Sequence, residues 1–111
     1  MRRTIRSVPL LFLVVLVLVV GLAAPASGGG SGPRRVRIVD NRFRPRTVTI
    51  DRGTAIRWVN RGTRDHTATG RTWSSGVLDP GDAFRRRFNR RGTFAYRCTI
   101  HATMRGTVVV Q

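Results

Sequence analysis

The stretch GTFAYRCTIHATMRGTVVV, Gly92 to Val110, contains the only cysteine of the chain and one of its two histidines. Its first half alternates, which places Phe94, Tyr96 and Cys98 on one side of an extended strand. This pattern is typical of a strand with one buried face, so the sulfur of Cys98 should point inward at the end of the strand. The closing residues, GTVVVQ, predict a last strand that is buried on both sides.

Cys98 is followed at equal intervals by His101 and Met104, which gives the spacing C-x2-H-x2-M. A buried cysteine standing alone is more often a small core residue than a functional one, and a lone methionine more often fills a core. Here, however, the other histidine, His66, lies just beyond a predicted strand that ends at Asn60. Loops at one end of a β-sandwich can bring two imidazoles, a thiolate and a thioether together.

Two histidines, a cysteine and a weak axial methionine are the ligand set of a blue (type 1) copper site. Imidazole suits both oxidation states of copper, whereas thiolate and thioether favour Cu(I), so the metal can change charge with little ligand movement. Zinc fits less well, because structural zinc sites usually take several cysteines in C-x2–4-C pairs and thioether is a poor zinc ligand. The sequence therefore predicts one copper ion at His66, Cys98, His101 and Met104.

The upstream segments show the same two-residue period between turn signals. The residues expected to face the core are Val36 and Ile38, Val48 and Ile50, and then Ile56, Trp58 and Asn60. Pro80-Gly81 predicts a turn before a strand with Phe84 and Phe88, and Arg86 on the phenylalanine face indicates a bulge or an edge position. About seven short strands of this kind predict an all-β fold, either an antiparallel β-sandwich or a small barrel.

Residues 1–26 predict an export peptide. Arg2, Arg3 and Arg6 precede an apolar run from Val8 to Val20, and Ala24-Pro25-Ala26 supplies a cleavage signal. The run is short for a membrane span, which needs about 20 apolar residues; an uncleaved membrane anchor is the alternative. Residues 27–33, SGGGSGP, predict a flexible leader, and residues 34–111 one domain. We therefore expect a periplasmic, cell-surface or secreted protein.

The chain of 111 residues has 21 basic residues, all arginine, against five aspartates and no glutamate, for a net charge of +16. Without Arg2, Arg3 and Arg6, 18 arginines face the five aspartates, so the mature part stays near +13. Such a field favours acidic partners or anionic membrane surfaces, whereas a solvated surface of biased composition is the plain alternative. Nucleic-acid binding is not expected, because exposed aromatic residues do not interleave the arginines.

At this point the sequence resembles a known family. YRCTIHATMRGTVVV is similar to the ligand loop of plastocyanin-like cupredoxins, especially the short-loop amicyanin and pseudoazurin-related group. FRPRTVTIDRGTAIRWVNRGTRDHTAT resembles the family segment F-x-P…V…G-x-x-V-x-W-x-N…H, with Ile56 in the valine place, and WSSGVLDPGDAFRRRF resembles the segment between them. The resemblance covers nearly all of Val36 to Val110 and implies a Greek-key antiparallel β-sandwich.

The resemblance also implies the role of each site residue. His66, Cys98 and His101 would form a trigonal plane around copper, with Met104 as the axial contact. Asn60 would tie the loop of His66 to the cysteine loop by hydrogen bonds; an ordinary turn residue at a strand end is the alternative.

In the family, electrons pass through the edge of the second ligand histidine. The resemblance thus implies a docking patch of Ile100, His101 and Ala102 for a redox partner protein, an acidic one oriented by the arginines. The amicyanin loop has prolines at the places of Ile100 and Ala102, a departure that leaves copper binding intact and alters the rigidity of the loop.

The predicted function is that of an exported one-electron carrier that cycles between Cu(I) and Cu(II). A copper carrier or buffer outside the cytoplasm is the alternative. Catalysis is not expected, because the core-facing Cys98 has no substrate cleft in so small a sandwich, and the glutamate of zinc deaminases is absent. We expect a monomer.

Overall fold

The computed structural model of the protein describes Thr4 and residues 32–111. Apart from Thr4, the predicted export peptide lies outside the described residues, and so does the leader as far as Ser31. Within the described part of the chain, no helix is long and apolar enough to cross a membrane.

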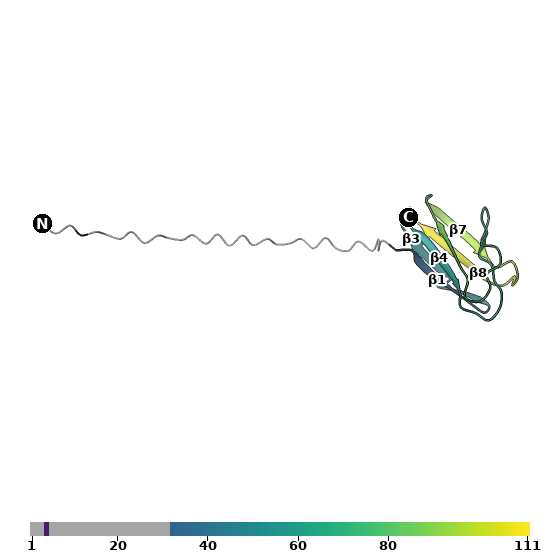
Figure 1. The fold of residues 1–111 in the computed structure, drawn as a ribbon. Coiled ribbons are helices and arrows are strands. Elements are labelled where there is room, and N and C mark those ends of the chain that lie inside the picture. Colours follow the sequence, from purple (N-terminus) through teal and green to yellow (C-terminus); the bar gives the residue numbers. More distant parts are fainter. Residues whose placement is uncertain (1–3, 5–31) are drawn as a thin grey trace.

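Residues 32–111 fold into two four-stranded sheets that pack face to face (Figure 1). The first sheet has the order β2-β1-β4-β6, formed by β1 (Arg34–Val39), β2 (Arg42–Arg44), β4 (Ala55–Asn60) and β6 (Ala83–Arg87). The second has the order β3-β8-β7-β5, formed by β3 (Thr47–Ile50), β8 (Arg105–Val110), β7 (Gly92–Arg97) and β5 (Thr69–Gly70). The predicted all-β sandwich is confirmed, with eight strands because the two-residue β5 pairs with β7.

Both sheets are mixed, because two strand pairs depart from the predicted antiparallel arrangement. β1 runs parallel to β4, with Val36 opposite Trp58, and β3 runs parallel to β8, with Val48 opposite Val108. The cause is the path of the chain, which leaves the first sheet after β2, forms β3 in the second sheet and returns as β4 beside β1. Strands that are joined by such a crossover can run in the same direction.

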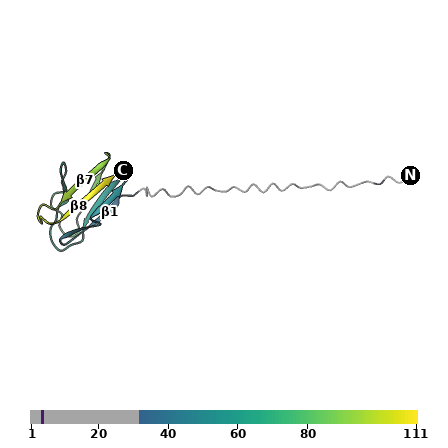
Figure 2. The same ribbon diagram turned by 180° about the vertical axis from the view of Figure 1, so that it is seen from behind.

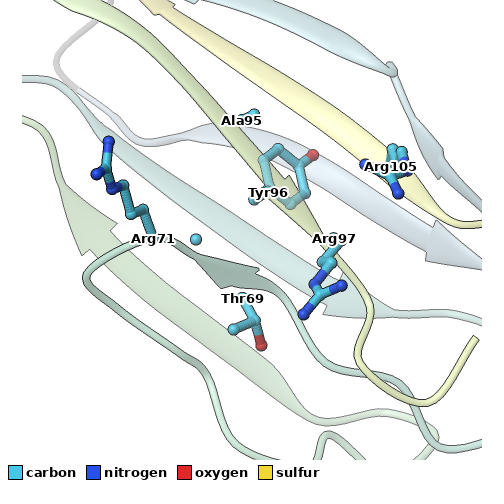
Figure 3. Close-up of a pocket in the computed structure, with 7 residues that line it drawn as sticks. Thr69, Arg71, Ala95, Tyr96, Arg97 and Arg105 are labelled. Carbon is cyan, nitrogen blue, oxygen red and sulfur yellow. The ribbon is translucent and has the colours of Figure 1, made fainter. Parts of the chain in front are cut away.

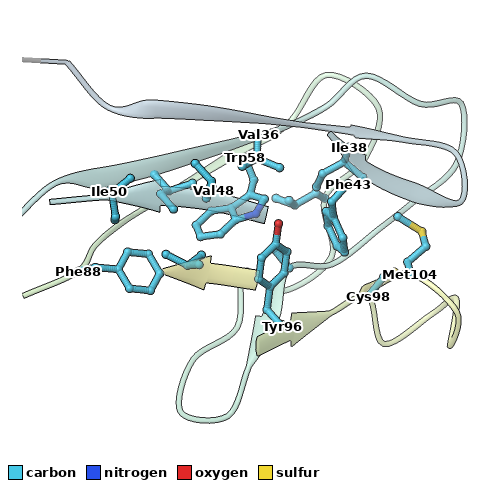
Figure 4. Packing of buried hydrophobic residues seen from close by; sticks show 14 of the residues in the cluster. Val36, Ile38, Phe43, Val48, Ile50, Trp58, Phe88, Tyr96, Cys98 and Met104 are labelled. Carbon is cyan, nitrogen blue, oxygen red and sulfur yellow. The ribbon is translucent and has the colours of Figure 1, made fainter. Parts of the chain in front are cut away.

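The core lies between the sheets and centres on Trp58, which is fully buried (Figure 4). Its ring centroid lies 5.1 Å from that of Trp73 and 5.4 Å from that of Tyr96. The alternation predicted from the sequence is confirmed, because Val36, Ile38, Val48, Ile50, Ile56, Trp58, Asn60, Tyr96 and Cys98 are all buried. Phe94, on the same face of β7, is half-buried.

The closing strand β8 differs from its prediction. Gly106, Val108 and Val110 are buried, but Thr107 and Val109 on the other face are only half-buried. In a two-layer sandwich the outer face of a sheet has no further layer to cover it. The unbroken run of valines therefore reflects a central strand position and not burial on both sides.

Strand β6 decides between the bulge and the edge position that were predicted for Arg86. It is an edge strand, and its register with β4 runs without a bulge from Ala55 opposite Arg87 to Val59 opposite Ala83. Arg86 is half-buried on the phenylalanine face, with its guanidinium carbon 5.4 Å from the ring centroid of Trp73 and 5.5 Å from that of Phe88. Cation–π contact lets an arginine occupy this aromatic face.

The loops that follow β1, β4 and β7 meet at one end of the sandwich. The chain termini of the domain lie at the opposite end, where Gln111 N donates to Ile50 O and Arg34 pairs with Ile56 (Figure 1, Figure 2). The C-terminal ends of these three strands thus lie together at the end of the sandwich opposite to the one where the chain enters the domain.

Gly106 gives a test of this packing. A Cβ at this position would collide with the ring and hydroxyl oxygen of Tyr96, whose ring is held 4.7 Å from that of Phe43. We predict that Gly106→Ala lowers the free energy of unfolding by about 1–3 kcal/mol through overpacking, measured by urea denaturation. The control is Gly32→Ala, whose Cβ would meet nothing within 4 Å; equal stability of both variants would contradict this packing.

Candidate metal centre

Three of the predicted ligands converge where β4 and β7 end. The Sγ atom of Cys98 lies 3.9 Å from Nδ1 of His66 and 3.7 Å from Nδ1 of His101, and the two nitrogens lie 3.2 Å apart. Nitrogen and sulfur donors about 2.0–2.3 Å from one ion in a trigonal plane would be roughly 3.5–3.8 Å apart. The triangle therefore has the size that a single metal ion fills with small adjustments.

His66 is fixed through both its main chain and its ring. Its backbone N donates to Leu78 O at 3.1 Å, and Leu78 N donates to His66 O at 2.7 Å. The ring is fully buried, and its Nε2 lies 3.1 Å from Oδ1 of Asp40. A carboxylate at Nε2 favours the proton on that nitrogen, which leaves the lone pair of Nδ1 directed at Cys98 and His101.

Asp40 is a residue of the site that the sequence analysis did not predict. Its carboxylate accepts hydrogen bonds from Oγ1 and N of Thr63, at 2.6 Å and 3.0 Å, and from N of Arg64 at 3.3 Å. The hydrogen bonds from Thr63, and then that to His66, hold the pKa of Asp40 well below its usual range, so the group is ionised. The alternation of inward and outward residues could have indicated Asp40 as a site residue. Asp40 continues the inward face of Val36 and Ile38, as Cys98 continues that of Tyr96.

Cys98 is fully buried and receives a backbone hydrogen bond on its sulfur. The donor is N of Thr67, 3.4 Å from Sγ. The side chain of Thr67 also accepts a hydrogen bond from N of Thr99 at 2.9 Å, and the two hydroxyl oxygens lie 3.0 Å apart. Thr67, the residue after His66, thus ties the histidine loop to the cysteine loop.

The predicted hydrogen bonds from Asn60 to the cysteine loop are wrong. Within the described residues, its Nδ2 donates to the carbonyl oxygens of Arg64 and Leu78, both at 2.8 Å, and its Oδ1 accepts from Gly62 N at 2.9 Å. The chain turns back over the end of β4, so these carbonyls lie nearer to the amide than the cysteine loop does. Because Leu78 pairs with the backbone of His66, Asn60 stabilises the position of the histidine through Leu78.

Met104 closes the cysteine loop. Its backbone N donates to His101 O at 3.0 Å, and its carbonyl accepts from Cys98 N at 3.1 Å. The side chain is buried in the core cluster at the same end as Cys98 (Figure 4). All four predicted ligands are therefore brought to one end of the core.

His101 differs from the other donors because it reaches the surface. It is half-buried, whereas the side chains of His66, Cys98 and Met104 are at most 1 % exposed. Its neighbour Ile100 is 48 % exposed, and Ala102 is also exposed. Apolar side chains thus flank, in sequence, the one predicted donor that reaches the surface.

One buried and one half-buried imidazole, a buried thiol and a buried thioether form the donor set at this end of the β-sandwich. Carboxylate oxygens are not part of the triangle, because Asp40 lies on the far side of the His66 ring. This composition fits a type 1 copper ion, whose ligands are two histidines, one cysteine and a weak axial methionine.

Comparison with known proteins identifies the family. The cupredoxin-like domain matches residues 10–110, and the chain belongs to this family. Amicyanin-alpha of Methylorubrum extorquens is 27% identical over 110 residues, which cover 90% of each chain. Plastocyanin of Scenedesmus fuscus is 30% identical over 84 residues, 62% of this chain and 86% of the relative. A purple cupredoxin from Nitrosopumilus maritimus shares the fold, with a TM-score of 0.68 at 23% identity over 70% of this chain and 99% of that one.

The family and the donor set together define a type 1 copper site, the kind that serves electron transfer. The predicted resemblance to cupredoxins and the prediction of a single copper ion as cofactor are confirmed.

Asp40 provides a test of the histidine's orientation. We predict that Asp40→Asn weakens copper binding about 10–100-fold, as loss of a partner behind a metal ligand typically does, measured by competition with a chelator. Asp51→Asn makes the same charge change at the other end of the sandwich, beyond β3, and should bind as the wild type does. Equal affinity in the two variants would show that Asp40 does not orient His66.

Proposed function

We propose that His66, Cys98 and His101 would hold a copper ion, with Met104 as its weak fourth contact, and that the protein carries one electron between redox partners. The preformed triangle of donors, 3.2–3.9 Å apart, is the observation that carries this proposal. When bound, copper supplies a centre that alternates between Cu(I) and Cu(II). The chain's own residues supply the fixed positions and the surroundings of that centre.

The network around the donors supports rapid electron transfer because it limits their movement. Asp40 holds the His66 ring, Thr67 holds the Cys98 sulfur, and Met104 is packed in the core. Ligands fixed by the fold need little rearrangement when the charge of the metal changes by one. The hydrogen bond to the sulfur and the apolar surroundings also tune the reduction potential.

His101 is the proposed electron port. Its half-buried ring supplies one corner of the donor triangle and also reaches the surface. Ile100 and Ala102 beside it offer the apolar contact that a partner needs to approach closely. The role requires docking and release without chemistry on a bound substrate, so we propose a monomeric carrier and not an enzyme. In agreement with the export signal read from the sequence, we place this role outside the cytoplasm.

The charges beside the loop support an acidic redox partner. A pocket of about 310 Å³ is lined by three arginines, Arg71, Arg97 and Arg105 (Figure 3). A second pocket, of about 260 Å³, is lined by Arg42, Arg46 and again Arg105, together with Thr103 of the ligand loop. Basic groups on both sides of the loop would steer a negatively charged protein toward His101.

Burial of the donors favours a shuttle of electrons over a carrier that delivers copper. His66, Cys98 and Met104 are each at most 1 % exposed, so release of the ion requires local opening of the core end. An electron needs only the exposed edge of His101.

Titration with Cu(II) tests the metal assignment. We predict one equivalent of bound copper and an intense visible thiolate-to-copper band, which Cys98→Ala abolishes. Thr99→Ala, one residue further on, keeps all four donors and should keep the band. Colourless binding by the wild type, or a band that survives in Cys98→Ala, would contradict the site.

Steering by the arginines is tested by ionic strength. We predict that the rate of electron transfer with an acidic redox protein falls as salt rises, because screening weakens the attraction. Arg105→Gln should lower the rate at low salt several-fold, whereas Arg90→Gln, beyond β6 at the end of the sandwich away from the metal centre, should leave it nearly unchanged. A wild-type rate independent of salt would remove the steering role.

A further inference from the structure

The first sheet carries an unusual concentration of arginine on its outer side. Its inward positions are mostly apolar, with Asn60 and Arg86 among the exceptions, whereas the outward positions of its four strands hold seven exposed arginines. These residues, called the basic face below, are Arg35 and Arg37 in β1, Arg42 and Arg44 in β2, Arg57 in β4, and Arg85 and Arg87 in β6.

Several arginines of the basic face are direct neighbours across strands. Arg57 pairs with Arg35 on one side and with Arg85 on the other, and Arg37 pairs with Arg44. Like charges directly opposite each other destabilise a sheet. Among the described residues the only ion pair is that of His66 with Asp40, so no acidic group compensates this repulsion.

A bias toward arginine throughout the chain does not account for this placement. The second sheet has outward positions of the same kind, yet in β3, β7 and β8 four of these eight positions are threonine and only two, Arg97 and Arg105, are arginine. Both sheets would carry similar numbers if composition alone set the pattern. The uneven distribution indicates that the basic face has a ligand.

We propose that the basic face binds a lipid bilayer with anionic headgroups. The charges extend over four strands spaced about 4.8 Å apart, so they form a broad layer of charge suited to a layer of phosphates. Guanidinium groups bind phosphate in bidentate geometry. Clusters of four to eight basic residues are typical of proteins that bind anionic lipid surfaces.

Apart from Arg42, which also lines the second pocket beside the ligand loop, this surface is separate from the proposed electron port. His101 lies in the loop between β7 and β8 of the second sheet, at the end of the sandwich, whereas the basic face is the broad side of the first sheet. A domain lying on this side would keep His101 accessible to a partner beside it. The inference goes beyond the proposed function and does not depend on copper.

Binding of the full-length chain to vesicles tests the proposal. Vesicles of phosphatidylglycerol and phosphatidylcholine are compared with phosphatidylcholine alone, and binding to the neutral vesicles is subtracted to remove the contribution of the apolar N-terminal run. The triple variant Arg35→Gln, Arg57→Gln, Arg85→Gln should lower the charge-dependent partition coefficient about 100-fold. The control Arg52→Gln, Arg90→Gln, Arg91→Gln removes the same charge from turns and should change it far less.

Chemical protection locates the contact even if the N-terminal run holds the chain on every vesicle. Arginine modification by phenylglyoxal, followed by mass spectrometry, should slow several-fold at Arg57 and Arg85 on anionic vesicles and stay unchanged at Arg90 and Arg91. Equal loss of binding in the two triple variants, or equal protection of both sets, would overturn the proposal. Binding to a DNA duplex without binding to anionic vesicles would also overturn it.

Discussion

Thr67 joins the two halves of the metal centre, and the rest of the site depends on this junction. Its backbone N–H binds the sulfur of Cys98, and its hydroxyl binds the backbone of Thr99. Thr67 lies in the loop after β4 of the first sheet, and both of its partners lie in the loop after β7 of the second. Because His66 precedes Thr67, packing of the two sheets brings the histidine and the cysteine together, and the site exists only in the folded sandwich.

The same junction relates stability to function. The fold holds the donors in place, and three of them are buried away from the surface. The surface is divided in a corresponding way. The exposed side of His101 has apolar sequence neighbours and arginines beside the loop, whereas the outward positions of the first sheet hold seven exposed arginines.

Much of this could be predicted from the sequence, because strands have a period of two. The alternation of inward and outward residues placed Cys98, Asn60 and Trp58 inside. The spacing C-x2-H-x2-M, together with the other histidine, predicted ligands that the structure brings to one end of the core. Strand direction could not be predicted, since alternation is the same in parallel and antiparallel pairs. The hydrogen bonds of Asn60 and Asp40 were also beyond reach, because they depend on how loops distant in sequence cross at the end of the sandwich.

The central claim is that the fold presets a type 1 copper site with two histidine nitrogens, one cysteine sulfur and a weak methionine contact. X-ray absorption at the copper edge, on the oxidised and the reduced protein, tests it most directly. We expect two nitrogen donors and one short sulfur contact in both states, with small changes of distance on reduction. A ligand shell of nitrogen and oxygen only, or the exchange of a donor between the two states, would contradict a preset site.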